Sequence, residues 1–102
     1  MRIIAKSRLH KYWGIRGNEQ SKPYLTEWYH FCLKQDWRAP QDIKNTFGTA
    51  SFVANNRVVF NVKGNDYRIV CALDYERQAM FLKFVGTHSE YDKIKADEVE
   101  QL

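Results

Sequence analysis

The spacing of apolar residues changes about halfway along the chain. Before residue 48 these residues recur three and four positions apart, as in amphipathic helices, and after it they alternate with polar residues, as in half-buried strands. Three helices are therefore predicted first, beginning at Ser7, at Ser21 and at Pro40, the last ending at Phe47. Strands are predicted over 51–54, 57–62, 66–74 and 79–87.

Short turns join the predicted strands into an antiparallel meander. Asn55 and Asn56 tolerate a positive φ, and Gly64 suits a tight hairpin over 63–65. Residues 2–5 favour one further strand, and residues 88–95 one further helical turn. Helices followed by a meander are typical of the α+β class, so we expect the N-terminal helices to pack on one face of a small antiparallel sheet.

The second predicted helix carries an aromatic face that has two interpretations. Leu25, Trp28, Tyr29 and Cys32 lie at the spacing of one helical face. A small domain needs such a face in its core. The alternative is a surface, centred on Trp28 and Tyr29, that binds a protein partner.

Length and composition predict a single globular domain. The 102 residues are 44% hydrophobic and 15% aromatic, which suffices for one modest core. No apolar run reaches the ~18–20 residues of a membrane span, and the basic N-terminus lacks the features of a signal peptide, so we expect the cytoplasm. The polar end predicts a flexible acidic tail over 96–102, after a domain over 1–95.

Basic residues dominate the body of the chain, whereas acidic residues gather near its end. The net charge is +4, and the first 18 residues include no acidic one. A basic body favours an anionic partner, RNA or DNA first, with a merely soluble basic domain as the alternative. Cys32 and Cys71 lie far apart in apolar segments, which favours buried free thiols over a disulfide framework or a zinc site.

Alternation along the long strands separates an apolar row from a row that contains cations. Phe60, and on the last strand Leu82 and Phe84, are expected to face the helices. The polar residues expected on the opposite face are Asn61, Lys63, Arg68 and Lys83. Ordinary solvated side chains are the alternative, and Lys83 by itself favours it. Arg68 lies in the middle of the sheet, where a guanidinium suits bidentate phosphate binding.

Most catalytic classes find little support in this sequence. His10, His30 and His88 lie in separate segments without the paired spacing of metal ligands. Nucleophile elbows, Walker loops and dinucleotide fingerprints are absent from the sequence, and neither cysteine lies in a polar turn. Metal-free acid–base chemistry is what these residues allow.

RNA is the substrate that such chemistry fits, because its 2′-hydroxyl is a built-in nucleophile. A ribonuclease then needs a base, an acid and cations for the charge of the transition state. His88 has the side-chain type that moves protons near neutral pH, and Tyr91 follows three residues later on the same side of a helical turn. Arg68 with Lys63 or Lys83 can hold the phosphate. A structural histidine is the alternative.

Several ordered blocks of sequence resemble the HigB-type toxins of bacterial type II toxin–antitoxin modules. They are DWRAPQDIK, FGTASF, RVVFNVKGN, YRIV and FVGTHSEYD, between residues 36 and 95. The resemblance implies a RelE-like fold and an mRNA endonuclease that cleaves translated message in the ribosomal A site by 2′-hydroxyl attack, with neither metal nor cofactor. It also implies a HigA-type helix-turn-helix antitoxin, encoded by an adjacent gene.

The resemblance also selects candidate site residues. Arg68, His88 and Tyr91 match polar positions of the last two blocks and become the catalytic candidates. The RNA-binding candidates are Asn61, Lys63 and Asn65, from the hairpin block, and Lys83. Acid and base roles vary among RelE-like toxins and are not assigned from the resemblance. A non-catalytic RNA- or ribosome-binding regulator on the same fold is the alternative function.

Overall fold

Five strands form one mixed sheet, in the order β1-β5-β4-β3-β2, in the computed structural model, which describes residues 1–101. Their bounds are Arg2–Ile4 (β1), Ser51–Val53 (β2), Arg57–Val62 (β3), Tyr67–Asp74 (β4) and Ala79–Thr87 (β5). The last four strands form the predicted antiparallel meander. β1 instead pairs in parallel with β5, so the sheet is mixed and not purely antiparallel as expected. Three antiparallel pairings separate β5 from β2, so β2, the strand that follows the helices, runs antiparallel to β1, and only β5 runs parallel to β1 among its neighbours in the sheet.

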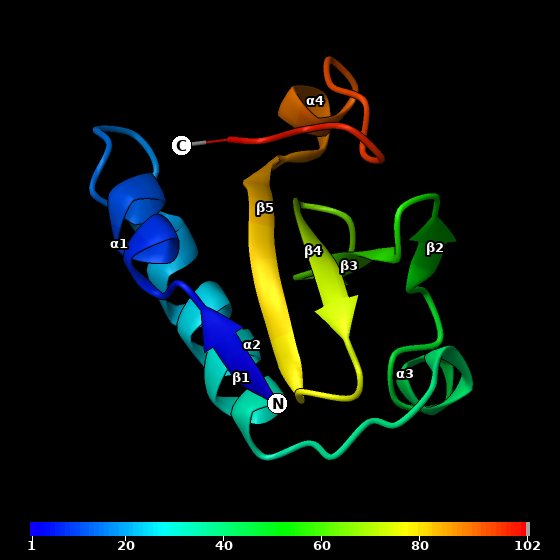
Figure 1. Ribbon diagram of the computed structural model, residues 1–102. Coiled ribbons are helices and arrows are strands. Elements are labelled where there is room, and N and C mark those ends of the chain that lie inside the picture. The colour runs from blue at the N-terminus through cyan, green and yellow to red at the C-terminus, as the bar shows by residue number, and fades with distance from the viewer. Residues whose placement is uncertain (102) are drawn as a thin grey trace.

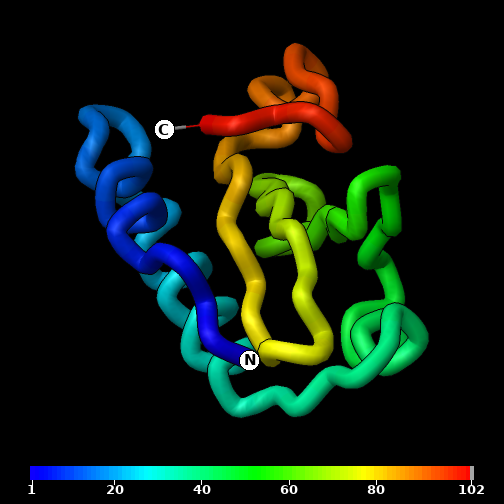
Figure 2. Tube along the Cα trace, in the orientation of Figure 1, coloured from blue at the N-terminus to red at the C-terminus, as the bar shows by residue number. Residues whose placement is uncertain are grey.

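The first three helices cover one face of this sheet, and the fourth follows β5 and packs its Tyr91 against the other face. Their bounds are Ser7–Trp13 (α1), Lys22–Leu33 (α2), Pro40–Thr46 (α3) and His88–Tyr91 (α4), with a short 3₁₀ turn over Glu19–Ser21. Figures 1 and 2 show α1 and α2 along the β1 side of the sheet and α3 toward its β2 side. This arrangement confirms the α+β class. None of the helices within residues 1–101 has the length and apolar character that a membrane crossing requires.

The main core lies between the helices and the sheet, and Phe60 is at its aromatic centre. The Phe60 ring lies 5.4 Å from Trp28, 5.2 Å from Phe47 and 6.2 Å from Trp37, measured between centroids. Trp28 is only 4% exposed, which confirms that the aromatic helix face is core and not a partner surface. Cys32 and Cys71 are buried free thiols, as predicted.

Both predicted turns use the backbone conformation that their residues favour. Asn55 and Asn56 have φ values of 66° and 56°. In the β3–β4 hairpin, Gly64 has a φ of 64°, and Lys63 also lies in the left-handed region at 54°. Because Val62 pairs with Tyr67 across the hairpin, the loop is four residues long and projects beyond the sheet.

A β-bulge in β5 changes which face Phe84 occupies. Phe84 pairs with Val70 of β4 and Leu82 pairs with Cys71, so Lys83 is the extra residue. Phe84 therefore lies on the outer face, opposite the helices, in contact with Val70. The expectation that Phe84 faces the helices with Leu82 is wrong, because strict alternation does not survive the bulge.

The outer face is partly covered by the segment that follows α4. Four residues of this region close a small apolar cluster over Val59, Val70 and Phe84: Tyr91, Ile94, Ala96 and Val99. Figures 1 and 2 show the segment crossing the sheet toward α1. We call residues 96–101 the strap.

The strap differs from the tail that composition predicts. Composition predicts a flexible segment over 96–102, whereas the structure places residues 96–101 against the sheet, because Ala96 and Val99 give an otherwise acidic segment an apolar side. Leu102 lies outside the described residues. The division into a domain over 1–95 and a flexible tail stays a prediction.

Candidate functional site

Arg68 lies on the outer face, directly across from Asn61 on one side and Gly86 on the other. Its guanidinium carbon is 4.7 Å from the centroid of the Tyr91 ring, and that ring packs at 6.2 Å against Phe84. The Nε atom of Arg68 is buried and lacks a hydrogen-bond partner within residues 1–101. A half-buried guanidinium that is held over an aromatic ring is well placed to bind an anion.

Gly86 makes this packing possible. A Cβ at position 86 would lie 2.6 Å from the Phe84 ring and 3.2 Å from the Cβ of Glu90. Any other residue would therefore displace the Phe84 ring, against which Tyr91 packs. The glycine is needed for close approach and not for an unusual backbone conformation.

His88 begins α4 next to the β3–β4 hairpin loop. Its backbone N–H donates to the backbone carbonyl of Asp66 at 3.2 Å, and its side-chain Nε2 lies 3.5 Å from the Asp92 carboxylate. His88 and Asn65 line the same open hollow of about 260 Å³. The structure thus brings one catalytic candidate and one RNA-binding candidate to a shared surface at the end of the sheet.

Glu90 fixes the orientation of α4 and was not selected by the sequence. Its carboxylate accepts hydrogen bonds from the N–H of Thr87 at 2.7 Å and from the hydroxyl of Tyr12 in α1 at 3.0 Å. The Thr87 hydroxyl in turn accepts from the N–H of Glu90 at 3.1 Å, which completes a capping box. Burial, and then the contact with Glu90, raise the pKa of Tyr12. The T-x-x-E spacing is a sequence signal that could have identified this pair.

Replacing Glu90 by alanine is expected to lower the free energy of unfolding by about 1–2 kcal/mol, because the carboxylate loses its hydrogen bonds with Tyr12 and with Thr87, the second of which is half of the capping box. Cleavage activity should fall with it, since α4 carries both His88 and Tyr91. Urea denaturation measures the first effect. Glu90→Gln is the control, because its amide oxygen can still accept both bonds; equal stability of Glu90→Ala and the parent protein would contradict the assignment.

Lys63 and Asn61 border a groove between β3 and α2. The ammonium of Lys63 lies 4.7 Å from the Tyr24 ring centroid and 3.6 Å from the Asp66 carboxylate, and these two neighbours raise its pKa. The expectation that Lys63 projects from the face opposite the helices is wrong, because β3 ends at Val62 and the side chain turns toward α2. The amide of Asn61 donates to the carbonyl of Thr49 at 3.0 Å. The groove measures about 480 Å³, and its aromatic lining is Tyr24, Trp28, Phe31 and Phe47.

Lys83 is the candidate that the structure separates from the others. Its Nζ lies 3.0 Å from the Glu100 carboxylate of the strap, which also lies 3.4 Å from Arg57. Sequence reasoning missed Arg57, because a cation at the first position of a strand carries no signal of its own. Among residues 1–101, His, Cys, Asp and Glu side chains form no group of three that could hold a metal ion.

A small mixed sheet with helices packed against it is consistent with the fold of RelE-like toxins. The family model described as HigB toxin, the RelE-like toxic component of a toxin–antitoxin system, matches residues 21–94. The chain therefore belongs to the HigB toxin family.

Curated relatives carry the same family name. The mRNA interferase HigB of Escherichia coli O6:H1 is 26% identical over 68 residues, covering 65% of this chain and 66% of that protein, just under two thirds of its length. The mRNA interferase toxin HigB of Escherichia coli K12 is 31% identical over 75 residues, covering 72% of each chain.

Proposed function

We propose that this protein is an mRNA interferase, an endoribonuclease that cleaves translated mRNA on the ribosome. The observation that carries the proposal is the stacking of Arg68 on Tyr91, at 4.7 Å, on the outer face of the sheet. Membership of the HigB toxin family and the names of the two relatives support it.

In this proposal Arg68, His88 and Tyr91 form the catalytic centre. The 2′-hydroxyl of one nucleotide attacks the adjacent phosphorus, and the bond to the 5′ oxygen of the next nucleotide breaks. Arg68 binds the charge that develops on the phosphoryl oxygens. His88 and Tyr91 take the proton from the nucleophile and return one to the leaving oxygen, with Asp92 orienting the imidazole of His88. Neither a cofactor nor a metal enters the scheme.

The neighbouring polar residues provide a path for the RNA. Asn65 shares the hollow of His88, and Lys63 and Asn61 border the aromatic groove on the other side of the hairpin loop. Lysines can bind phosphates along such a path, and exposed aromatic rings such as Tyr24 can stack on bases.

Function of this kind needs two partners. The first is the ribosome, whose A site would present the mRNA, and this places the protein in the cytoplasm. The second is an antitoxin, for which we propose a HigA-type protein with a helix-turn-helix domain, encoded by an adjacent gene. Co-expression with the adjacent gene should suppress the toxicity.

Replacing His88 by alanine and Tyr91 by phenylalanine tests the catalytic centre directly. Each change should lower mRNA cleavage by about 10²–10⁴-fold, which is the contribution of a proton-transfer group, while binding to ribosomes persists. Mapping mRNA 5′ ends after induction in growing cells, alongside ribosome co-sedimentation, measures both quantities. His30→Ala and Tyr75→Phe are controls of the same residue types outside the site.

The alternative function, a non-catalytic RNA- or ribosome-binding regulator, makes the opposite prediction. Under it the two substitutions would leave growth arrest intact, and no new mRNA ends would appear. That result would reject the endonuclease and retain the binding protein.

A further inference from the structure

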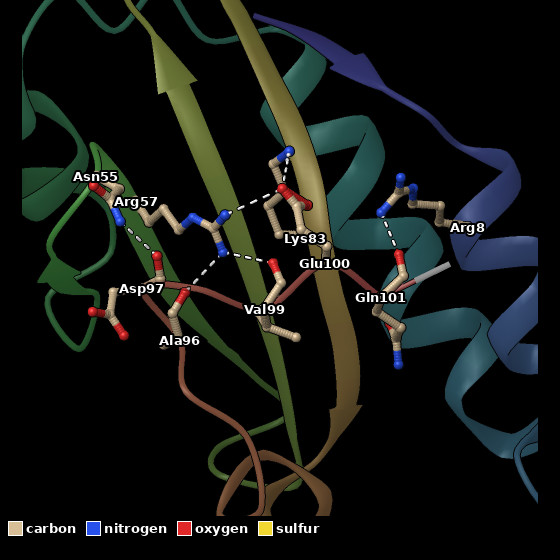
Figure 3. A network of polar contacts seen from close by, with 9 residues as sticks. All are labelled: Arg8, Asn55, Arg57, Lys83, Ala96, Asp97, Val99, Glu100 and Gln101. Carbon is tan, nitrogen blue, oxygen red and sulfur yellow. Dashed lines mark hydrogen bonds and ion pairs between the residues drawn. The ribbon is translucent and has the colours of Figure 1, made fainter.

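Glu100 of the strap lies among cations from three separate elements. Its carboxylate is 3.0 Å from Lys83 of β5 and 3.4 Å from Arg57 of β3. Lys83 makes the largest contribution to lowering the pKa of Glu100, and Arg57 and Arg8 of α1 add to it. Figure 3 shows the three cationic side chains reaching the strap from three directions. One carboxylate thus neutralises part of a larger positive charge.

The strap hides these cations by contacts of its main chain. Arg57 donates to the carbonyls of Ala96 at 3.1 Å and Val99 at 2.7 Å, and it is only 7% exposed (Figure 3). At the other end, Arg8 donates to the carbonyl of Gln101. These contacts show that the strap takes part in burying Arg57.

Gln101 anchors the strap to the part of β5 that follows the residues paired with β1. Its side-chain amide forms two hydrogen bonds with the main chain of Val85, at 2.8 and 3.1 Å, and its N–H donates to the carbonyl of Lys83 at 2.9 Å. Asn55 holds the opposite end through the carbonyl of Asp97 at 2.8 Å. Water can replace each of these hydrogen bonds when the strap leaves the sheet, so the net contribution of each bond is modest.

Two of the three cations, Arg57 and Lys83, come from the sheet that carries the proposed catalytic centre, and Arg8 reaches the strap from α1. Arg57 precedes Asn61 by four residues of the same strand, a distance of about 13 Å, and Asn61 lies directly across from Arg68. RNA that extends from Arg68 along the strands would therefore reach Arg57 and Lys83 within a few nucleotides. A polyanion competes well for such a site, because the Glu100 side chain is 57% exposed and its ion pairs are screened by solvent.

We propose that Arg8, Arg57 and Lys83 form a second binding site for RNA backbone phosphate, and that Glu100 occupies this site as an internal substitute until RNA displaces the strap. The inference rests on the proposed function, because it supplies the substrate class. It also explains Lys83, the RNA-binding candidate that is separated from the others. RNA is favoured over an acidic protein segment because Arg57 and Lys83 lie in the two strands that flank the strand of Arg68.

Glu100→Gln is the decisive variant, and Glu98→Gln is its matched control. Both changes remove one negative charge from the strap, but Glu98 lies 3.9 Å from Lys95 and is paired with none of the three hidden cations. The probe is a short single-stranded 2′-O-methyl RNA, which lacks the nucleophile and stays intact. Affinity is measured between 50 and 200 mM salt, a range over which the binding of phosphates is strongly screened.

We expect Glu100→Gln to bind the probe about 5–10-fold more tightly and to steepen the salt dependence by about 0.7 for each additional phosphate that the protein neutralises. Glu98→Gln should change the affinity by less than about twofold, as an exposed charge does. Equal effects of the two substitutions would overturn the inference.

Lys83→Met, made in the parent protein and in Glu100→Gln, shows whether the increase in affinity arises at Lys83. It should remove most of the increase produced by Glu100→Gln and have a smaller effect on the parent protein, because there Lys83 is already paired. Equal losses in both backgrounds would overturn the inference. It would also be overturned if Glu100→Gln bound the antitoxin more tightly than the parent protein does but bound the RNA probe no more tightly. Thermal unfolding checks that each variant is folded.

The two proposals fail in different ways. If the parent protein cleaves mRNA while Glu100→Gln and Glu98→Gln bind the probe alike, the second site is wrong and the endonuclease stands. If the parent protein produces no new mRNA ends, the endonuclease is wrong whatever the probe does.

Discussion

Replacing Arg68 by alanine is expected to lower mRNA cleavage by about 10²–10³-fold, as loss of one group that stabilises transition-state charge does. The guanidinium carbon lies 4.7 Å from the centroid of the Tyr91 ring on the outer face, where the partly exposed side chain can bind a phosphate. Single-turnover cleavage of mRNA on programmed ribosomes measures the loss. Overall stability should change little, because Arg68 is only partly buried.

Two further arginine variants define what Arg68 does. Arg68→Lys keeps the charge but loses the planar fork and the stacking on Tyr91, so it should recover only part of the activity. Arg77→Ala is the control, because Arg77 lies on the β4–β5 turn and pairs with Asp74 at 3.1 Å. Equal activity of Arg68→Ala and Arg77→Ala would remove Arg68 from the catalytic centre.

Replacing Phe60 by alanine is expected to lower the free energy of unfolding by about 3–5 kcal/mol. Phe60 is fully buried, and three aromatic rings surround it within 6.2 Å, so the truncated side chain would leave a cavity that its rigid neighbours cannot fill. Urea denaturation followed by tryptophan fluorescence measures the change. A loss of this size is a large part of the stability of a small domain.

Phe81 provides the matched control for this prediction. It is also a phenylalanine in a strand of the same sheet, but it is 36% exposed. Phe81→Ala should therefore cost about 1 kcal/mol or less. Similar losses for the two variants would show that the aromatic cluster is not the centre of the core.

Sequence reasoning succeeded where structure is set by local burial. The predicted bounds of β3 and β5 agree with the structure, because a strand with one buried face must place apolar residues at every second position. Asn55, Asn56 and Gly64 located the turns for an equally local reason, their tolerance of positive φ.

Features that depend on pairing between distant segments were beyond this reasoning. The parallel pairing of β1 with β5 depends on the path that the helices take, and the strap depends on contacts such as Arg57 with Val99. The candidate site divides in the same way. The sequence identified which residue types form the candidate site. The strand register that places Arg68 opposite Gly86 and against the Tyr91 ring is set only when the sheet assembles.

The bulge at Lys83 has a consequence for insertion and deletion in this chain. If residue 83 were deleted, Leu82 would still face the helices, Phe84 the outer face and Val85 the helices, in strict alternation. Position 83 is therefore dispensable for the hydrophobic pattern of β5. The side chain at position 83 can therefore change in charge without altering the positions of the apolar residues of β5.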